Sequence, residues 1–262
     1  MSRFPLANVH PEAKIGNNVT IEPFATVQAD VVIDDDTWIG PTSVIMDGAR
    51  IGKNCKIFPG AVISGIPQDL KFKGEKTTTE IGDNTTIREC VTINRGTVDK
   101  FKTVIGANCL IMAYAHVGHD CIIGSHCILG NTVQLAGHVL IDDYAIFGGA
   151  CAVQQFSKIG AHAYIGGGSL VRKDIPPFTK VAREPISYAG INTVGLRRRG
   201  FSQDQINDIQ EIYRYIFLKG LNTSKALEKV GAEISQSAER DYIIDFIQTS
   251  ERGIMKGYGG ND

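Results

Sequence analysis

The stretch of sequence that decides the fold covers residues 105–141, which read IGANCL IMAYAH VGHDCI IGSHCI LGNTVQ LAGHVL I in blocks of six. An aliphatic residue opens every block, from Ile105 to Ile141. An amphipathic helix would repeat about every 3.6 residues and a half-buried strand every two, so a period of six indicates neither. Small residues such as Cys109 and Ala115 lie four residues after each aliphatic one. Large and small residues that alternate in this way predict the interior of a narrow prism.

The same pattern extends along the chain in both directions from this stretch. It runs from Val9 to Ile63, returns over 81–93, and continues past Ile141 to Val171. If three blocks complete one coil, residues roughly 18 apart stack in columns and each face becomes a ladder of short parallel strands about 4.8 Å apart. Gly, Asn and Asp often follow the aliphatic residue and suit tight corners with left-handed backbone. The sequence therefore predicts a parallel β-helix.

Two polar segments that contain glycine interrupt the repeat, at about 64–80 and 95–103. Loops that leave a rigid scaffold often carry function, although a tolerated surface insertion is the alternative for each. After Val171 an irregular stretch is expected as far as Gly200, and Ser202 with Gln205 then forms a capping box that starts a helix ending at Gly220. Two further helices are expected at about 223–236 and 239–252. We therefore expect a β-helix over residues 1–190 and an α-helical domain over residues 191–262 that caps its open end.

The composition excludes several classes of partner. The chain has 27 Lys and Arg against 28 Asp and Glu, so its net charge of −1 gives no overall attraction to nucleic acid or to an anionic membrane. No stretch approaches the roughly 20 apolar residues that span a bilayer, and we expect a cytoplasmic protein without a transmembrane segment. Five of the six cysteines occupy the small inward column, where a free thiol behaves as a small hydrophobic group: Cys55, Cys109, Cys121, Cys127 and Cys151. Disulfide or metal roles are the less favoured alternative for them.

The histidines are the residues that could carry chemistry. His119 lies between two residues that the register points inward, Val117 and Cys121, so its side chain is expected outside the prism. Asp120 follows directly and could orient the ring. His138 comes one coil and one position later and can be a neighbour of His119. An imidazole that titrates near neutrality could take a proton from an attacking hydroxyl, although plain surface polarity is the alternative.

The sequence contains no Ser-His-Asp elbow motif, so direct acyl transfer is favoured over a covalent acyl-enzyme. The oxyanion that forms during such a transfer needs hydrogen-bond donors, and the backbone N–H of Gly137 could supply one. A second polar cluster, Arg197-Arg198-Arg199, could bind phosphate. A solvated linker, or a cap on the last carbonyls of a helix, is the alternative for these arginines.

Several segments together resemble the UDP-N-acetylglucosamine 3-O-acyltransferases, the family that begins lipid A synthesis. The resemblance covers nearly the whole chain, helical tail included. Its most specific marks are Pro67-Gln68-Asp69-Leu70-Lys71, Ile87-Arg88-Glu89, Val91-Thr92-Ile93, Arg95-Gly96-Thr97, the AHVGHDC stretch at 115–121, Leu135-Ala136-Gly137-His138-Val139, Gly195-Leu196 and Arg198-Arg199-Gly200-Phe201.

This resemblance implies a left-handed parallel β-helix of hexapeptide repeats, assembled as a homotrimer with its sites between subunits. It implies His119 as the general base, supported by Asp120, with Gly137 N–H on the thioester oxyanion. Residues that would hold the sugar and the phosphopantetheine are Gln68, Asp69, Lys71, His116 and His138. Residues that would hold the UDP portion are Gln155, Asn192, Arg198 and Arg199. Gly167 stands at the position that limits acyl-chain length, where a glycine leaves room for a long chain.

The family resemblance also implies the substrates and the absence of a cofactor. The donor would be a 3-hydroxyacyl thioester on the phosphopantetheine of acyl carrier protein, and the acceptor UDP-N-acetylglucosamine, with no metal. The chain departs from well-known members at Gln154, where they carry His, and at Val194, where they carry Glu.

Four alternatives remain open on the sequence. One is a family variant that acts on a 3-amino UDP-sugar. Another is a different hexapeptide transferase, such as a CoA-dependent acetyltransferase. A third is a metal hydratase of the γ-carbonic-anhydrase kind, with His116, His119 and His138 as ligands, and a fourth is a non-catalytic solenoid.

Overall fold

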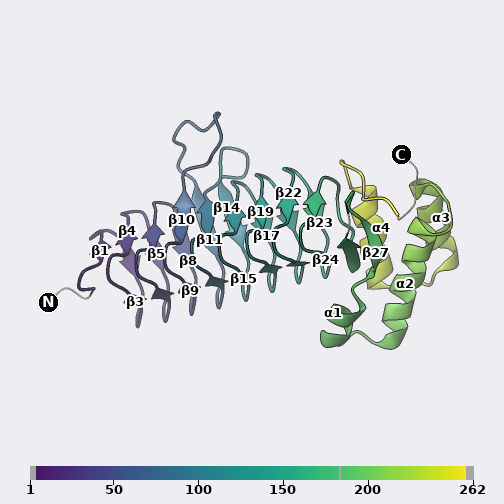
Figure 1. Cartoon of the computed structure of the whole chain (residues 1–262), viewed down its shortest axis with the longest axis horizontal. Coiled ribbons are helices and arrows are strands. Elements are labelled where there is room, and N and C mark those ends of the chain that lie inside the picture. Colours follow the sequence, from purple (N-terminus) through teal and green to yellow (C-terminus); the bar gives the residue numbers. More distant parts are fainter. Residues whose placement is uncertain (1–3, 183, 258–262) are drawn as a thin grey trace.

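The computed structural model describes residues 4–182 and 184–257, which form a long β-helix with helices packed at its C-terminal end (Figure 1). Short strands stack into three sheets, one on each side of the coil. The first sheet contains β1 (Asn8–Val9), β4 (Thr26–Val27), β7 (Val44–Ile45), β10 (Val62–Gly65), β13 (Thr92–Asn94), β16 (His116–Val117), β19 (Gln134–Leu135), β22 (Ala152–Val153) and β25 (Leu170–Val171).

The other two sheets follow the same stacking order. The second contains β2 (Lys14–Ile15), β5 (Val32–Ile33), β8 (Ala49–Ile51), β11 (Thr78–Ile81), β14 (Lys102–Ile105), β17 (Ile122–Ile123), β20 (Leu140–Ile141) and β23 (Lys158–Ile159). The third contains β3 (Thr20–Ile21), β6 (Trp38–Ile39), β9 (Lys56–Ile57), β12 (Thr86–Ile87), β15 (Leu110–Ile111), β18 (Ile128–Leu129), β21 (Ile146–Phe147), β24 (Tyr164–Ile165), β26 (Thr179–Ala182) and β27 (Ser187–Ile191). All pairs are parallel except the final hairpin β26–β27. The predicted parallel β-helix is confirmed.

The two columns that repeat in the sequence line the interior of the prism. Ile111 and Val117, from the large column, are fully buried, and so are Cys121 and Cys127 from the small one. None of the six cysteines forms a disulfide, and the five predicted to be inward are buried while Cys90 is exposed. Most corners between strands hold a residue with left-handed backbone, such as Asn18 with a φ of 51°. Asn and Asp tolerate this conformation because their side chains bond locally.

Both predicted excursions leave the same side of the β-helix and stand close together (Figure 1). The longer one joins β10 to β11, and the shorter one joins β13 to β14. The neck of the longer loop is braced from β13 and the residue after it. There the Asn94 amide donates to Ile66 O at 3.1 Å, and Arg95 N donates to Gly65 O at 2.9 Å.

The C-terminal part contains more regular structure than the sequence predicts. The stretch expected to be irregular contains the hairpin β26–β27 and a short helix, α1 (Thr193–Arg198). Pro176-Pro177 ends the six-residue repeat, and the sequence predicts no regular strand or helix directly after it. The capping box at Ser202 is confirmed, and α2 (Gln203–Phe217) ends three residues before Gly220. The last two helices, α3 (Thr223–Glu233) and α4 (Ala238–Gln248), are shorter than expected. No helix in the described ranges is long and apolar enough to cross a membrane. A division into two domains near residue 190 stays a prediction.

Candidate active site

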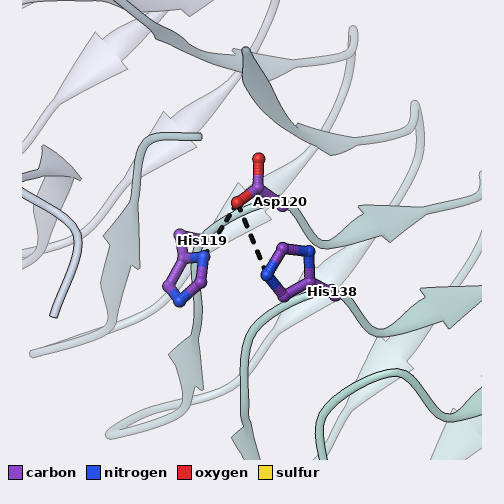
Figure 2. Close-up of side chains that lie close together, drawn as sticks. All are labelled: His119, Asp120 and His138. Carbon is purple, nitrogen blue, oxygen red and sulfur yellow. Dashed lines mark hydrogen bonds and ion pairs between the residues drawn. The ribbon is translucent and has the colours of Figure 1, made fainter. Parts of the chain in front are cut away.

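The polar cluster His119, Asp120 and His138 lies at one corner of the β-helix (Figure 2). His119 and Asp120 form the turn after β16, and His138 lies in the corresponding turn one coil later, after β19. Val117 and Cys121 are buried inside the prism. His119 and Asp120, which lie between them in the sequence, are therefore outside the interior column, as the register predicts for His119. The imidazole rings of His119 and His138 meet edge to face, with centroids 4.9 Å apart.

Asp120 is the most enclosed member of this cluster, with a fully buried side chain. One carboxylate oxygen, Oδ2, lies 2.8 Å from His119 Nδ1 and 3.9 Å from His138 Nε2. Burial by itself would raise the pKa of the Asp120 carboxyl. Hydrogen bonds from His119 and from Thr97 outweigh that effect, so the pKa lies below its usual value and the group is ionised at neutral pH.

An ionised Asp120 fixes the tautomer of the His119 ring. Because the carboxylate can only accept, His119 Nδ1 carries the proton in the hydrogen bond and Nε2 presents its lone pair. The His119 side chain is 13% exposed, so part of the ring can be reached from the surface. An imidazole held in this way has the geometry of a general base.

Gly137 forms the floor beneath the His119 ring. A Cβ at this position would lie 2.6 Å from His119 Cε1 and 2.7 Å from Nε2, so only glycine lets the ring pack here. At the matching turn position in another coil, Ser125 N donates to Asp143 Oδ1 at 2.7 Å. Among the described residues none accepts the Gly137 N–H, which is therefore available to a ligand next to His119.

His116 lies one turn before the cluster, on β16, with Nδ1 2.8 Å from the Thr92 hydroxyl on β13. Burial, and to a smaller extent the nearby His119, lowers the pKa of His116 below its usual value. The His116 ring is therefore neutral at pH 7 and can offer hydrogen bonds without a charge.

The shorter excursion supplies residues to the site for which the sequence predicted no role. Thr97 donates to Asp120 through its N–H and its hydroxyl, and Asp99 Oδ2 lies 3.0 Å from His138 Nδ1. Two signals in the sequence pointed to this loop: it breaks the repeat shortly before His116, and Arg95-Gly96-Thr97 is one of the marks of the family resemblance.

The longer excursion carries Gln68, Asp69 and Lys71 on its outer part. Asp69 Oδ1 accepts from Lys71 N at 2.9 Å, while Gln68 and Lys71 are exposed. Within the described parts of the chain, no hydrogen bond links these three residues to the histidine cluster.

The residues expected to bind UDP fall into separate places. Asn192 and Arg198 line a cavity of about 460 Å³ together with Lys180, Tyr164 and Val194. Arg199 turns the other way and packs on the β-helix.

The guanidinium of Arg199 donates to Tyr144 O at 3.2 Å and lies 5.1 Å from the centre of the Tyr144 ring. Gln155 and Gly167 are exposed at turns further along the β-helix. Gln154 lines a shallow cleft with Arg172.

The ligand atoms of His119, Asp120 and His138 all lie within 4.8 Å of one another, so this set could hold a metal ion. It differs from the metal set considered on the sequence, because Asp120 takes the place of His116. The atom of Asp120 that faces both rings, Oδ2, already accepts a hydrogen bond from the Thr97 hydroxyl at 2.7 Å. The donor set is therefore committed to a hydrogen-bond network, which fits proton transfer better than metal ligation.

Comparisons with known proteins agree with this geometry. Residues 174–255 match the family described as Udp N-acetylglucosamine O-acyltransferase, domain 2, and residues 30–65 and 102–137 match the bacterial transferase hexapeptide family. The acyl-[acyl-carrier-protein]–UDP-N-acetylglucosamine O-acyltransferase of Chlorobaculum parvum is 46% identical over 95% of this chain and 97% of its own length. The corresponding enzyme of Pseudomonas putida is 43% identical over 96% of this chain and 98% of its own length.

Solved structures extend the agreement to the fold. The UDP-N-acetylglucosamine acyltransferase of Bacteroides fragilis superposes with a TM-score of 0.96 at 53% identity, over 97% of this chain and 100% of that one. The Francisella novicida enzyme superposes with a TM-score of 0.94 at 42% identity, over 97% and 94%. The chain therefore belongs to the UDP-N-acetylglucosamine O-acyltransferase family.

Proposed function

We propose that this protein transfers a 3-hydroxyacyl chain from acyl carrier protein to the 3-hydroxyl of UDP-N-acetylglucosamine, the first step of lipid A synthesis. The observation that carries the proposal is the pair formed by His119 Nδ1 and the buried Asp120 carboxylate, 2.8 Å apart. This pair leaves His119 Nε2 as a base on an accessible surface. The near-full-length relatives with this activity support it.

The reaction needs one proton acceptor and one oxyanion donor. His119 Nε2 takes the proton of the sugar hydroxyl while the hydroxyl oxygen forms a bond to the thioester carbon. Negative charge moves to the thioester oxygen, where the Gly137 N–H can donate. The C–S bond then breaks, and the imidazolium returns its proton to the phosphopantetheine sulfur. No covalent acyl-enzyme and no metal enter these steps.

The other residues are proposed to bind the substrates rather than to react. Gln68, Asp69, Lys71, His116 and His138 would hold the sugar and the phosphopantetheine. Gln155, Asn192, Arg198 and Arg199 would hold the nucleotide, with Asn192 and Arg198 supported by their shared cavity. Gly167 would leave room for the end of the acyl chain.

The assembly is proposed to be a homotrimer with active sites between subunits, working in the cytoplasm. Two observations support an assembly. Among the described residues no hydrogen bond joins Gln68 or Lys71 to His119, so a neighbouring copy could supply this loop. Leu6, Phe24 and Tyr114, on one corner of the prism, are between 61% and 72% exposed, which is unusual for apolar side chains that no partner covers.

A product assay with a matched pair of variants tests the proposal. Purified protein is given 3-hydroxyacyl carrier proteins with UDP-N-acetylglucosamine or its 3-amino analogue, and the products are identified by mass spectrometry. His119→Ala should fold normally and lose roughly 10²–10⁴ in turnover, the usual contribution of a general base. His126→Ala is the control, because His126 occupies an equivalent turn but stacks on Tyr144 instead.

The outcomes separate the alternatives. Normal turnover by folded His119→Ala would contradict the mechanism. Acylation of the 3-amino sugar alone would show that this sugar, and not UDP-N-acetylglucosamine, is the acceptor. Absence of any acylated product from the wild type, together with stoichiometric metal in the purified protein, would favour the hydratase alternative.

A further inference from the structure

The shorter excursion closes over the carboxylate of the proposed catalytic pair. Asp120 Oδ1 accepts from Thr97 N at 2.9 Å and from Lys100 N at 3.2 Å. Asp120 Oδ2 accepts from the Thr97 hydroxyl at 2.7 Å, and this same oxygen faces His119 Nδ1. The two carboxylate oxygens therefore receive three hydrogen bonds from one loop.

The conformation of this loop is fixed by contacts within the loop itself. Phe101 N donates to Thr97 O at 2.8 Å, which closes a turn around the Thr97 side chain. A Cβ on Gly96 would lie 2.2 Å from Lys102 N, so the chain doubles back on itself at that residue. Thr97 is only 6% exposed as a result.

Without these donors the Asp120 carboxylate could rotate, and a buried charge that lacks hydrogen bonds would be energetically costly. Asp120 has left-handed backbone with a φ of 58°, and its own N–H donates to the Thr103 hydroxyl at 2.9 Å. These contacts hold the main chain of Asp120. Its carboxylate is hydrogen-bonded by the loop and by His119, while His138 Nε2 lies further away, at 3.9 Å. Hydrogen bonds to charged groups are among the stronger ones in proteins.

The same loop also reaches the second imidazole. Asp99 Oδ2 lies 3.0 Å from His138 Nδ1, and Asp99 N donates to the Thr97 hydroxyl at 3.3 Å. Thr97 therefore lies at the centre of a network that orders the carboxylates facing both histidines.

We infer that Thr97 is a positioning residue for the acyl transfer, holding the Asp120 carboxylate so that Oδ2 points at His119 Nδ1. The inference rests on the proposed function, since it assigns Thr97 a role through the proposed base. Thr97 acts on Asp120 and not on the substrate, so its removal should lower kcat and leave KM for UDP-N-acetylglucosamine unchanged.

Three variants test this role. Thr97→Val keeps the shape and removes the hydroxyl donor, and kcat should fall about 10-fold or more, the effect of losing a hydrogen bond to a charged group. Thr97→Ser keeps the donor and should restore kcat to within about threefold of the wild type. Thr85→Val is the matched control, since Thr85 is fully buried and its hydroxyl makes two bonds, to Gly106 O and from Cys109 N, away from the cluster.

Each outcome decides the inference. An unchanged kcat in Thr97→Val, a fall no larger than in Thr85→Val, or no recovery in Thr97→Ser would overturn it. If Thr97→Val does not fold, Thr97→Ala takes its place, and failure of both to fold would show a structural role instead. Full activity in His119→Ala would sink the proposed function itself, whereas an inactive His119→Ala with a normal Thr97→Val would sink only the role of Thr97.

Discussion

At the scale of single residues, the site depends on how closely backbone and ring approach each other. His119 is a corner residue that would point into solvent if the next coil did not carry glycine beneath it. Gly137 both makes room for the His119 ring and presents its N–H beside it. In the proposed mechanism this one residue would serve both the base and the oxyanion, and so would couple the two halves of the reaction.

Gly137→Ala should therefore damage catalysis more than folding. The added Cβ would lie 2.6 Å from His119 Cε1, so the ring must move away from its position. We expect kcat to fall at least about 10-fold, because even small misplacement of a catalytic group is costly. Circular dichroism and steady-state kinetics would check this.

The control for that variant is Gly231→Ala, in helix α3, where nothing lies within 4 Å of the new Cβ. It should keep full activity and gain up to about 1 kcal/mol of stability, as alanine is the better helix former. Wild-type kcat in a folded Gly137→Ala protein would contradict the assignment of Gly137.

Gly167→Met should shorten the preferred acyl chain. The nearest atom to a Cβ at Gly167 is Gly149 O at 3.2 Å, and the position is exposed, so the side chain can be accommodated with a small shift and would project outward. Each methylene that loses its apolar contact is worth about 0.8 kcal/mol. Competition between carrier proteins of different chain length measures the effect, and an unaltered chain-length profile would remove Gly167 from the acyl site.

At the scale of elements, the corner that faces α1 is a ladder of stacked rings. His126 stacks on Tyr144 with centroids 4.6 Å apart, Tyr144 on His162 at 4.9 Å, and His162 on Phe178 at 5.6 Å. The guanidinium of Arg199, which follows helix α1, lies over the Tyr144 ring and makes a cation–π contact with it. This ladder joins the β-helix to the segment that leads into the helices.

His162 makes this ladder sensitive to acid. Burial first, and then the positive charge of Arg199, lower the pKa of His162 to about 4. The unfolded chain takes up a proton near its ordinary pKa of about 6.5, so unfolding becomes easier as pH falls from 6.5 towards 4.

His162→Phe should remove that part of the acid sensitivity. It keeps a ring in the ladder and deletes Nδ1, a buried atom without a hydrogen-bond partner in the described structure, so stability at pH 7.5 should not fall. Urea unfolding at pH 7.5 and pH 5 would compare the two proteins. An equal drop in the unfolding midpoint for both would show that His162 does not contribute.

The elements also show how far sequence could lead. The β-helix was predictable because its period of six is repeated by every coil, and the capping box at Ser202 is a local signal. The contact between Thr97 and Asp120 was not predictable, because a loop that leaves the repeat has no register to place its side chains. The hairpin β26–β27 was not predicted, because its strands follow Pro176-Pro177 and lack the six-residue repeat of the β-helix.

At the scale of the whole molecule, the parts proposed for one reaction are spread along the axis. The longer loop, the histidine corner and the cavity at Asn192 and Arg198 follow one another from β10 to α1. In the proposed homotrimer two chains would lie side by side, so a neighbouring copy could supply one of these parts to the site of the other.

We therefore expect sedimentation equilibrium to give three times the chain mass of 28.4 kDa. Mixed trimers offer a sharper measurement. His119→Ala and Lys71→Ala should each be impaired alone, but co-expression should restore part of the activity, since some interfaces then pair an intact base with an intact loop. A stable active monomer, or no recovery in mixed trimers, would reject sites shared between subunits.

The stacking of residues 18 apart, as between Asn18 and Asp36, has a consequence for how this enzyme can change in length. Deleting or duplicating one whole coil leaves every later residue on its own face and shifts it by about 4.8 Å along the axis. Deleting a single block of six would instead carry the later residues round to the next face and separate them from their partners. The reach between His119 and the Arg198 cavity can therefore evolve only in discrete steps, while the exposed tip of the longer excursion lies outside the repeat and can vary one residue at a time.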